Sequence, residues 1–151
     1  MAERIAIASD HAGIALKSTL AAWLREQGHA VTDLGAHDHG SVDYPDYGHR
    51  IAEAVAGDEA DFGIALCGSG VGISIAVNRN PAARCALVSE PFSARLARRH
   101  NDANVIAMGA RLIGEDMAKS CVHAFLETPF EGGERHERRV AKLSHFAKEP
   151  A

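Results

Sequence analysis

Long apolar runs are missing from this sequence, and so is any pattern that marks a chain for export. No stretch reaches the roughly 18 apolar residues that a membrane-spanning helix requires. The N-terminus places Glu3 and Arg4 ahead of a short apolar run and has no signal-peptide pattern. We therefore expect no transmembrane helix and no membrane partner, and we expect the chain to be cytoplasmic.

Cysteine is also scarce, and the chain has no net positive charge. Cys67, Cys85 and Cys121 are the only cysteines, an odd number without a C-x-x-C pair, so we expect no disulfide bonds. Each thiol is then either part of the core or reactive. The formal net charge is -4, which argues against a nucleic-acid partner, so any anion site must be built from local basic residues.

The length and composition of the chain suit one folded domain over residues 1–151. A domain of this size buries roughly 70% of the surface that its unfolded chain exposes, which is enough for a hydrophobic core. The chain is 46% hydrophobic and 24% charged, near the globular average, and this excludes a disordered or fibrous protein. There is no internal repeat, linker or low-complexity stretch.

Short apolar runs alternate with segments of helical periodicity. The first helical segment carries an apolar stripe and ends at Gly28. Asp43 is placed to cap a helix with Pro45 in its first turn, and Ser89 to cap another that runs to about His100. A further helix is expected over 114–126, and a basic helix follows Glu131-Gly132-Gly133. The expected strands are 4–8, 30–34, 61–67, 84–88 and 104–108.

This alternation predicts an α/β protein with a three-layer, Rossmann-like fold. Five strands separated by helices imply a parallel sheet with helices on both faces. Ligands of such sheets bind beyond the C-terminal ends of the strands. The residues that directly follow strands are therefore the first candidates for a site: Asp10-His11, 67–72, Ser89-Glu90 and Gly109-Ala110-Arg111.

The glycine-rich segment 67–72, Cys-Gly-Ser-Gly-Val-Gly, is the strongest local signal. Alternate glycines permit a tight turn with several exposed N–H groups, and the helix expected next is partly positive at its N-terminus. An anion is expected there. The spacing fits neither G-x-G-x-x-G nor a P-loop. A tight turn without a ligand explains the glycines alone equally well.

Cys67 stands at the end of a strand and begins this loop. A free cysteine is most often a buried apolar residue. A thiolate beside a helix N-terminus is stabilised, however, so Cys67 is suited to act as a base or a nucleophile. Cys85 and Cys121 fall within a strand and a helix, and we expect both in the core. Asp10 should cap a helix and, together with His11, is also suited to proton transfer.

Two further polar segments have ordinary structural explanations. His100-Asn101-Asp102 ends a helix, where a polar C-cap is sufficient to explain Asn101. The segment 37–39, His-Asp-His, has residue types that bind metals, but no further histidine pair or carboxylate-rich helix completes a site. We expect a solvated loop there and no metal.

Together these segments resemble the ribose-5-phosphate isomerase B family, which also contains galactose-6-phosphate and allose-6-phosphate isomerases. The similarity covers nearly the whole chain, in order, and the cysteine-glycine loop combined with the His-Asn-Asp segment is specific to the family. The matching segments are 9–13, 43–45, 67–76, 89–91, 99–104, 109–111 and 131–133, followed by Arg135, His136 and Arg139.

The resemblance implies an aldose–ketose isomerase of the pentose phosphate pathway. It would interconvert ribose 5-phosphate and ribulose 5-phosphate through a cis-enediolate, without cofactor or metal. Cys67 would move the proton between C1 and C2, with the hydroxyl of Ser69 beside it. His100 would open the furanose ring, and Asp10 would handle the hydroxyl protons. The implied substrate-binding residues are His11, Tyr44, Gly68, Gly70, Val71, Gly72, Asn101, Arg111, Arg135, His136 and Arg139.

Within that set, the resemblance implies a phosphate site made of His11, Arg111, Arg135, His136 and Arg139. The C-terminal members would come from the partner subunit of a homodimer, and a tetramer stays open as the alternative assembly. The family usually reads Glu-Gly-Gly-Arg-His, whereas Glu134 is inserted here. We expect the extra residue to bulge at the glycines, because Arg135 and Arg139 stay four apart on one helix face.

Other functions remain open from the sequence. A six-carbon substrate, galactose or allose 6-phosphate, depends on pocket depth. A small module that binds a sugar phosphate or a nucleotide would use the glycine loop and the arginines but would not need Cys67 or His100. A thiol enzyme with a covalent intermediate is the least favoured, because no neighbouring His-Asp pattern activates a nucleophile.

Overall fold

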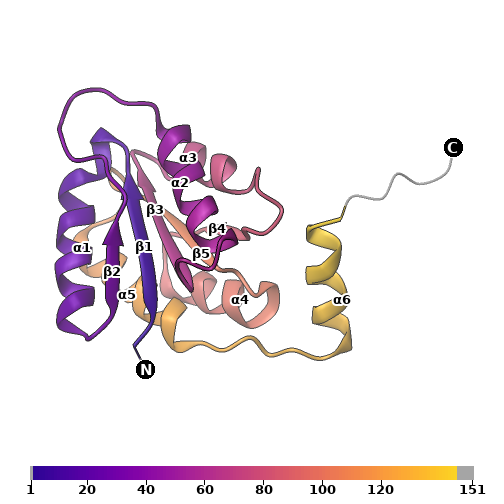
Figure 1. Cartoon of the computed structure of the whole chain (residues 1–151). Helices are drawn as coiled ribbons and strands as arrows, with labels where there is room; N and C mark the ends of the chain where they lie inside the picture. The colour runs from indigo at the N-terminus through magenta and orange to yellow at the C-terminus, as the bar shows by residue number, and fades with distance from the viewer. Residues whose placement is uncertain (1, 146–151) are drawn as a thin grey trace, which may run out of the picture.

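The five strands within residues 2–145 run parallel in a single sheet with the order β2-β1-β3-β5-β4 (Figure 1). The computed structural model describes residues 2–145. The predicted α/β fold and parallel sheet are confirmed, and each strand end lies within one residue of its predicted position. The strands are β1 Arg4–Ser9, β2 Ala30–Asp33, β3 Phe62–Cys67, β4 Cys85–Leu87 and β5 Val105–Gly109.

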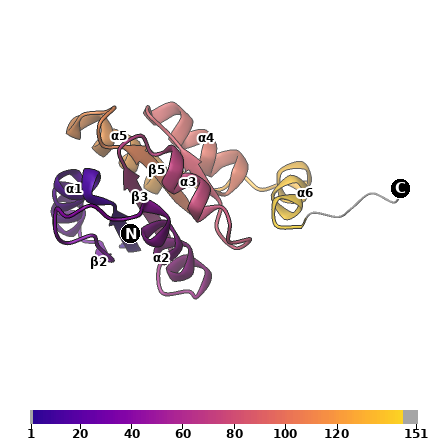
Figure 2. The same ribbon diagram turned by 90° about the horizontal axis from the view of Figure 1, so that it is seen from above.

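Helices cover both faces of this sheet (Figure 2). Along β1, Ile5 and Ile7 point into one core with α1, α4 and α5, whereas Ala6 and Ala8 point into another with α2 and α3. Small residues on the second face let α2 and α3 pack closely on the strands. The helices are α1 Ile14–Glu26, α2 Tyr44–Ala56, α3 Val71–Val77, α4 Pro91–Asn101, α5 Glu115–Glu127 and α6 Glu134–Leu143, with a short 3-10 helix, η1, at His11–Gly13.

The order of the strands decides where a ligand can bind. The chain passes from β1 to β2 on one side and then to β3 on the other, so a crevice opens beyond the C-terminal ends of β1 and β3. Ser9, Cys67 and Gly109 end the three central strands at this edge. The glycine-rich loop therefore lies at the topological switch point of the sheet.

The helix caps differ in part from the sequence-based expectation. The prediction that Ser89 caps α4 was wrong: the side chain of Glu90 accepts hydrogen bonds from the amides of Phe92 and Ser93. Pro91 is the first residue of α4, a position that proline favours, so the residue before it, Glu90, is the N-cap. The prediction for Asp10 is confirmed, since its Oδ1 accepts from the amide of Ala12 at 3.0 Å.

The C-terminal helix α6 stands apart from the body of the domain and touches it mainly at α4 (Figure 1). His136 is its single buried residue. The helix begins at Glu134, directly after Gly132 and Gly133, which both have positive φ values of 70° and 84°. Among residues 2–145, no helix combines the length and the apolar character needed to cross a membrane.

Candidate active site

The C-terminal edge of the sheet carries an open cavity of about 360 Å³. Asp10 reaches it from the end of β1, Cys67 from the end of β3 and Arg111 from the end of β5, while Tyr44 comes from the first turn of α2. Residues far apart in the sequence therefore meet here. The lining residues are Asp10, Tyr44, Cys67, Gly68, Ser69, Gly72, Arg111 and Leu112.

Cys67 is held by the loop that it begins. The amide of Gly70 donates a hydrogen bond to its Sγ at 3.1 Å, and the thiol side chain is almost fully buried. This hydrogen bond fixes the sulfur at the wall of the cavity, where it can reach a bound substrate. Gly70 has φ of 80°, and a Cβ there would lie 2.6 Å from Cδ1 of Leu87, so only glycine fits this position.

Two other glycines of the loop make room for side chains of the site. A Cβ at Gly72 would lie 2.6 Å from ring atoms of Tyr44, and a Cβ at Gly68 would lie 3.2 Å from Nη1 of Arg111. The phenol ring and the guanidinium group thus rest directly on the loop backbone. The glycines therefore position neighbouring side chains as well as exposing amides, a role that the sequence did not reveal.

The turn that follows β1 contributes a carboxylate and an imidazole. Asp10 is buried, and among the described residues only its Oδ1 has a hydrogen-bond partner, so Oδ2 can accept from a ligand. The amide of Val42 donates to Nδ1 of His11 at 3.2 Å. A neutral His11 must therefore carry its proton on Nε2, where it can donate to an anion.

The other two thiols are structural. Burial raises the pKa of Cys121 to about 11 and that of Cys85 to about 12, so both are protonated thiols at neutral pH. Cys121 lies in the core, as predicted. Cys85 is only half-buried in the edge strand β4, where it packs against the second core cluster.

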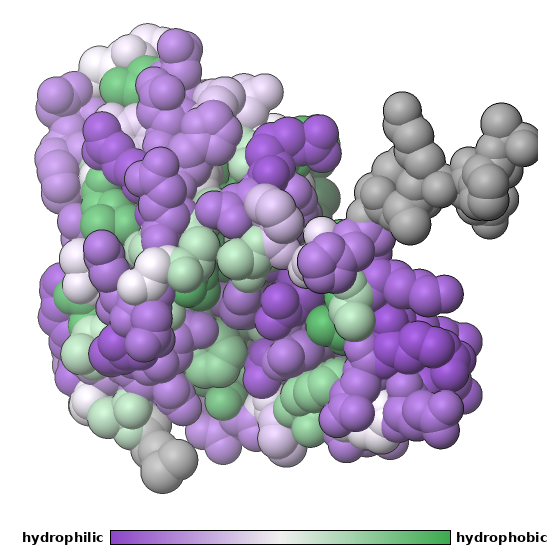
Figure 3. All heavy atoms as spheres, turned by 45° about the vertical axis from the view of Figure 1, so that its right-hand side comes forward, coloured by the Kyte–Doolittle hydropathy of each residue, from purple (hydrophilic) through white to green (hydrophobic). Residues whose placement is uncertain are grey.

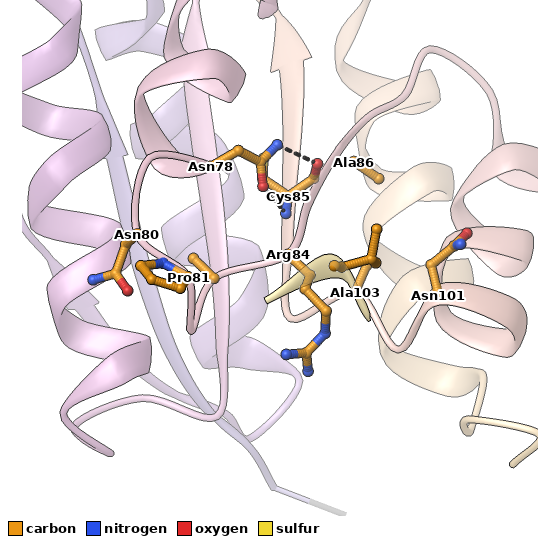
Figure 4. A pocket seen from close by; sticks show the side chains of 10 residues that line it. Asn78, Asn80, Pro81, Arg84, Cys85, Ala86, Asn101 and Ala103 are labelled. Carbon is orange, nitrogen blue, oxygen red and sulfur yellow. Dashed lines mark hydrogen bonds between the residues drawn. The ribbon is translucent and has the colours of Figure 1, made fainter. Parts of the chain in front are cut away.

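The predicted site residues divide into two groups that do not meet within one chain. Helix α4 returns from the C-terminal to the N-terminal edge of the sheet, so His100 and Asn101 lie at the end of the molecule opposite Cys67. Asn101 instead lines a second cavity of about 420 Å³ together with Arg84, Cys85 and Leu143 (Figure 4). Arg135, His136 and Arg139 lie on α6, which packs against α4.

The second group includes a residue that the sequence analysis did not select. The ring of His100 stacks on the ring of His136, with centroids 4.7 Å apart and planes within 4°. Oε2 of Glu131 lies 3.6 Å from Nε2 of His100 and 3.9 Å from Nε2 of His136. Glu131 belongs to a segment that carried the family resemblance, but only the fold shows that its carboxylate faces both imidazoles.

Comparison with known proteins supports the family suggested by the sequence. A family model described as Ribose/Galactose Isomerase matches residues 5–143. The chain is 46% identical over 142 residues to ribose-5-phosphate isomerase B of Escherichia coli (strain K12), covering 94% of this chain and 95% of the relative.

Solved structures agree with this result. A ribose 5-phosphate isomerase from Thermotoga maritima superimposes with a TM-score of 0.92 at 49% identity, covering 94% of this chain and 97% of that one. The type B ribose 5-phosphate isomerase of Trypanosoma brucei gives a TM-score of 0.91 at 40% identity, covering 95% and 98%. This chain therefore belongs to the ribose/galactose isomerase family.

Proposed function

We propose that this protein is an aldose–ketose isomerase that interconverts ribose 5-phosphate and ribulose 5-phosphate in the pentose phosphate pathway. The observation that carries the proposal is the hydrogen bond from the Gly70 amide to Sγ of Cys67, inside a cavity that also holds Asp10 and Arg111. The names of the relatives in Escherichia coli and Thermotoga maritima support the same substrate. A pentose phosphate pathway enzyme would act in the cytoplasm.

Proton transfer is assigned to Cys67. The thiolate removes the proton from C2 of the open-chain aldose and returns it to C1 of the cis-enediolate, which gives the ketose. The negative oxygen of the enediolate needs fixed donors. The amides of Gly70 and Val71 already bond to Cys67 and Ser69, so the other amides of the glycine loop would supply them, without side chains that would crowd the sugar. Loss of one such donor typically costs about 2.7–4 kcal/mol of transition-state stabilisation.

Asp10 and Ser69 complete the proposed reaction centre. The Oδ2 atom of Asp10 is available to move a proton between the hydroxyl groups on C1 and C2 while Oδ1 keeps the cap bond to Ala12. The Ser69 hydroxyl accepts from the amide of Val71 at 3.2 Å, so its own proton can be donated to the substrate. Arg111 and His11 are suited to bind the phosphate, since a guanidinium group binds it bidentately.

Ring opening is assigned to His100, which requires a second copy of the chain. Because His100 lies at the opposite end of its own subunit, we propose a homodimer in which α4 and α6 of one subunit complete the cavity of the other. Exposed apolar side chains next to the loop support this arrangement: Leu87 adjoins Gly70, and Val71 and Ile75 project from α3. Figure 3 shows apolar patches among polar ones on the side of the molecule where α6 projects.

Steady-state kinetics on three substrates test this function. Ribose 5-phosphate should give a higher kcat/KM than galactose 6-phosphate or allose 6-phosphate, measured side by side on enzyme treated with EDTA. Exchange of solvent deuterium into the substrate should accompany turnover, because the proton passes through Cys67. A higher kcat/KM for a six-carbon phosphate would reassign the substrate. Binding without exchange would identify a sugar-phosphate or nucleotide-binding module instead.

A further inference from the structure

The two stacked histidines and Glu131 form the one group of three or more histidine, cysteine and acidic side chains among residues 2–145 whose ligand atoms lie close together. One ligand atom from each side chain lies within 4.8 Å of the others. His100 comes from the last turn of α4, Glu131 from the segment that follows α5, and His136 from α6. Three separate elements therefore present nitrogen and oxygen donors to one point.

These donors match the preferences of zinc. A tetrahedral Zn²⁺ binds imidazole nitrogen and carboxylate oxygen at about 2.0–2.2 Å, which places neighbouring ligand atoms about 3.3 Å apart. The two contacts of Glu131 Oε2, at 3.6 and 3.9 Å, already approach that spacing. The parallel rings must tilt toward each other to share an ion. The side chain of His100 is 41% exposed and has room to do so.

The surrounding backbone holds the cluster in place. The amide of Glu131 donates to the carbonyl of Arg99 at 3.0 Å, which ties the linker to the end of α4 beside His100. His136 is the buried anchor of α6, and its position is fixed by packing against α4. The C-terminal end of a helix such as α4 is partly negative and favours a cation.

We propose that His100, Glu131 and His136 form an inhibitory site for a borderline divalent cation such as Zn²⁺. The ion occupies Nε2 of His100 and clamps α6 against α4. This consequence rests on the proposed function, in which His100 opens the sugar ring: an Nε2 atom that is bound to a metal can neither accept nor donate a proton. Loss of His136 as a phosphate ligand would slow both directions alike, but proton transfer at Cys67 does not involve His100, so inhibition should be stronger when the substrate arrives as a ring.

Direct binding measurements test the site itself. Tag-free, metal-stripped full-length protein is titrated with Zn²⁺ by calorimetry, and Co²⁺ serves as a visible-absorption probe of nitrogen and oxygen ligation. We expect one ion per chain. Glu131→Gln and His136→Asn should each weaken Zn²⁺ binding by at least about tenfold, since even outer-shell partners contribute 10–100-fold to metal affinity.

Matched variants test whether other metal-binding side chains of the protein, His37, His39 and Cys67, account for the Zn²⁺ binding. The double variant His37→Asn with His39→Asn removes an exposed histidine pair and should bind Zn²⁺ like the parent, as should Cys67→Ala. Glu131→Gln changes an exposed side chain, so it remains informative if His136→Asn loosens α6. Absence of Zn²⁺ binding, or binding unchanged in both Glu131→Gln and His136→Asn, would overturn the site.

Initial rates in the two directions test the consequence. Zn²⁺ should slow the reaction from ribose 5-phosphate more strongly than the reaction from ribulose 5-phosphate, which is an open chain, and EDTA should reverse the effect. Absence of inhibition would overturn the inhibitory role, and equal inhibition in both directions would overturn its action through ring opening. Neither result affects the proposed isomerase activity, because that activity is measured on the metal-free enzyme.

Discussion

At the scale of single residues, the environment of each thiol separates one reactive candidate from two inert ones. Cys67 receives the Gly70 amide and faces a cavity, whereas Cys121 is enclosed by apolar side chains that raise its pKa to about 11. The sequence placed Cys67 at a strand end and Cys121 inside a helix, and this was enough to distinguish them. The donor to sulfur depends on the left-handed turn at Gly70, which no pattern of residue types specifies.

Replacement of the proposed base should remove activity without unfolding the protein. Cys67→Ala is expected to lower kcat by at least about a hundredfold, the low end for acid–base catalysis. The side chain lost is small, so the unfolding midpoint should change little. Cys121→Ala and Cys85→Ala serve as matched controls and should remain active. A Cys67→Ala enzyme with parental kcat would show that another group moves the proton.

The contact between Gly72 and Tyr44 predicts a specific coupling. Gly72→Ala should push the Tyr44 ring away from the cavity and lower kcat/KM by about 10- to 100-fold, because small displacements of positioning groups are costly. In a Tyr44→Ala background the same change should cause no further loss of activity. There it should slightly stabilise α3, since alanine is the better helix former. Equal losses in both backgrounds would mean that Gly72 acts independently of Tyr44.

At the scale of elements, a buried ion pair ties α1 to the segment after β2. Nζ of Lys17 lies 2.7 Å from Oδ1 of Asp33 and 2.6 Å from the carbonyl oxygen of Ala36, and the lysine side chain is only 2% exposed. Burial of Asp33 opposes its charge, but Lys17 and the amide of Gly35 outweigh burial and hold the pKa of Asp33 below 3.8. The same segment leads to Val42, which orients His11.

Breaking this pair should destabilise the fold in a pH-dependent way. Lys17→Met is expected to cost about 3 kcal/mol at pH 7, near the low end for a buried pair, because Asp33 keeps a quarter of its side chain in water. A carboxyl with a lowered folded-state pKa contributes stability above its unfolded pKa, and the contribution is lost as pH falls through the folded value. The difference between Lys17→Met and the parent should therefore shrink below pH 3.8.

Urea unfolding of both proteins across the acid range measures this effect. Lys119→Met is the matched control, since Lys119 pairs with Glu115 at the surface of α5 and should leave the unfolding midpoint almost unchanged. A difference between Lys17→Met and the parent that stays constant below pH 3.8 would assign the loss of stability to packing of the lysine stem.

The elements themselves were largely predictable from periodicity, and their ends were not. The strand expected over 84–88 shortens to Cys85–Leu87, because the amide of Arg84 bonds to the side chain of Asn104. Ser89 and Glu90 are both acceptable caps by residue type, and Pro91 decided between them through its fixed φ. Side-chain hydrogen bonds that compete for an element end are set by tertiary contacts, which periodicity does not contain.

At the scale of the whole molecule, the fold explains why the predicted site divides into two groups. The resemblance placed Cys67 and His100 in one reaction, and the topology puts them at opposite edges of the sheet. Sequence patterns identify which residues follow strands, but they carry no information about a second subunit. The sequence alone therefore predicted the edge with Cys67 from its own signals, and the edge with His100 only through the family resemblance.

Mixing two inactive variants decides whether the subunits share their sites. Cys67→Ala and His100→Asn are each inactive from ribose 5-phosphate under the proposed mechanism. In a two-fold symmetric dimer with shared sites, a mixed pair has one site with both changes and one site with neither. Random reassembly of equal amounts should then restore about a quarter of the parental activity, because about half of the dimers are mixed and each has one intact site.

The matched control mixes the parent with the double variant Cys67→Ala/His100→Asn. Every mixed dimer there has two damaged sites, so activity should fall to about a quarter of that of the unmixed parent at equal total protein, rather than to about half. If His100 acted within its own chain, the first mixture would stay inactive and the second would keep about half of the activity.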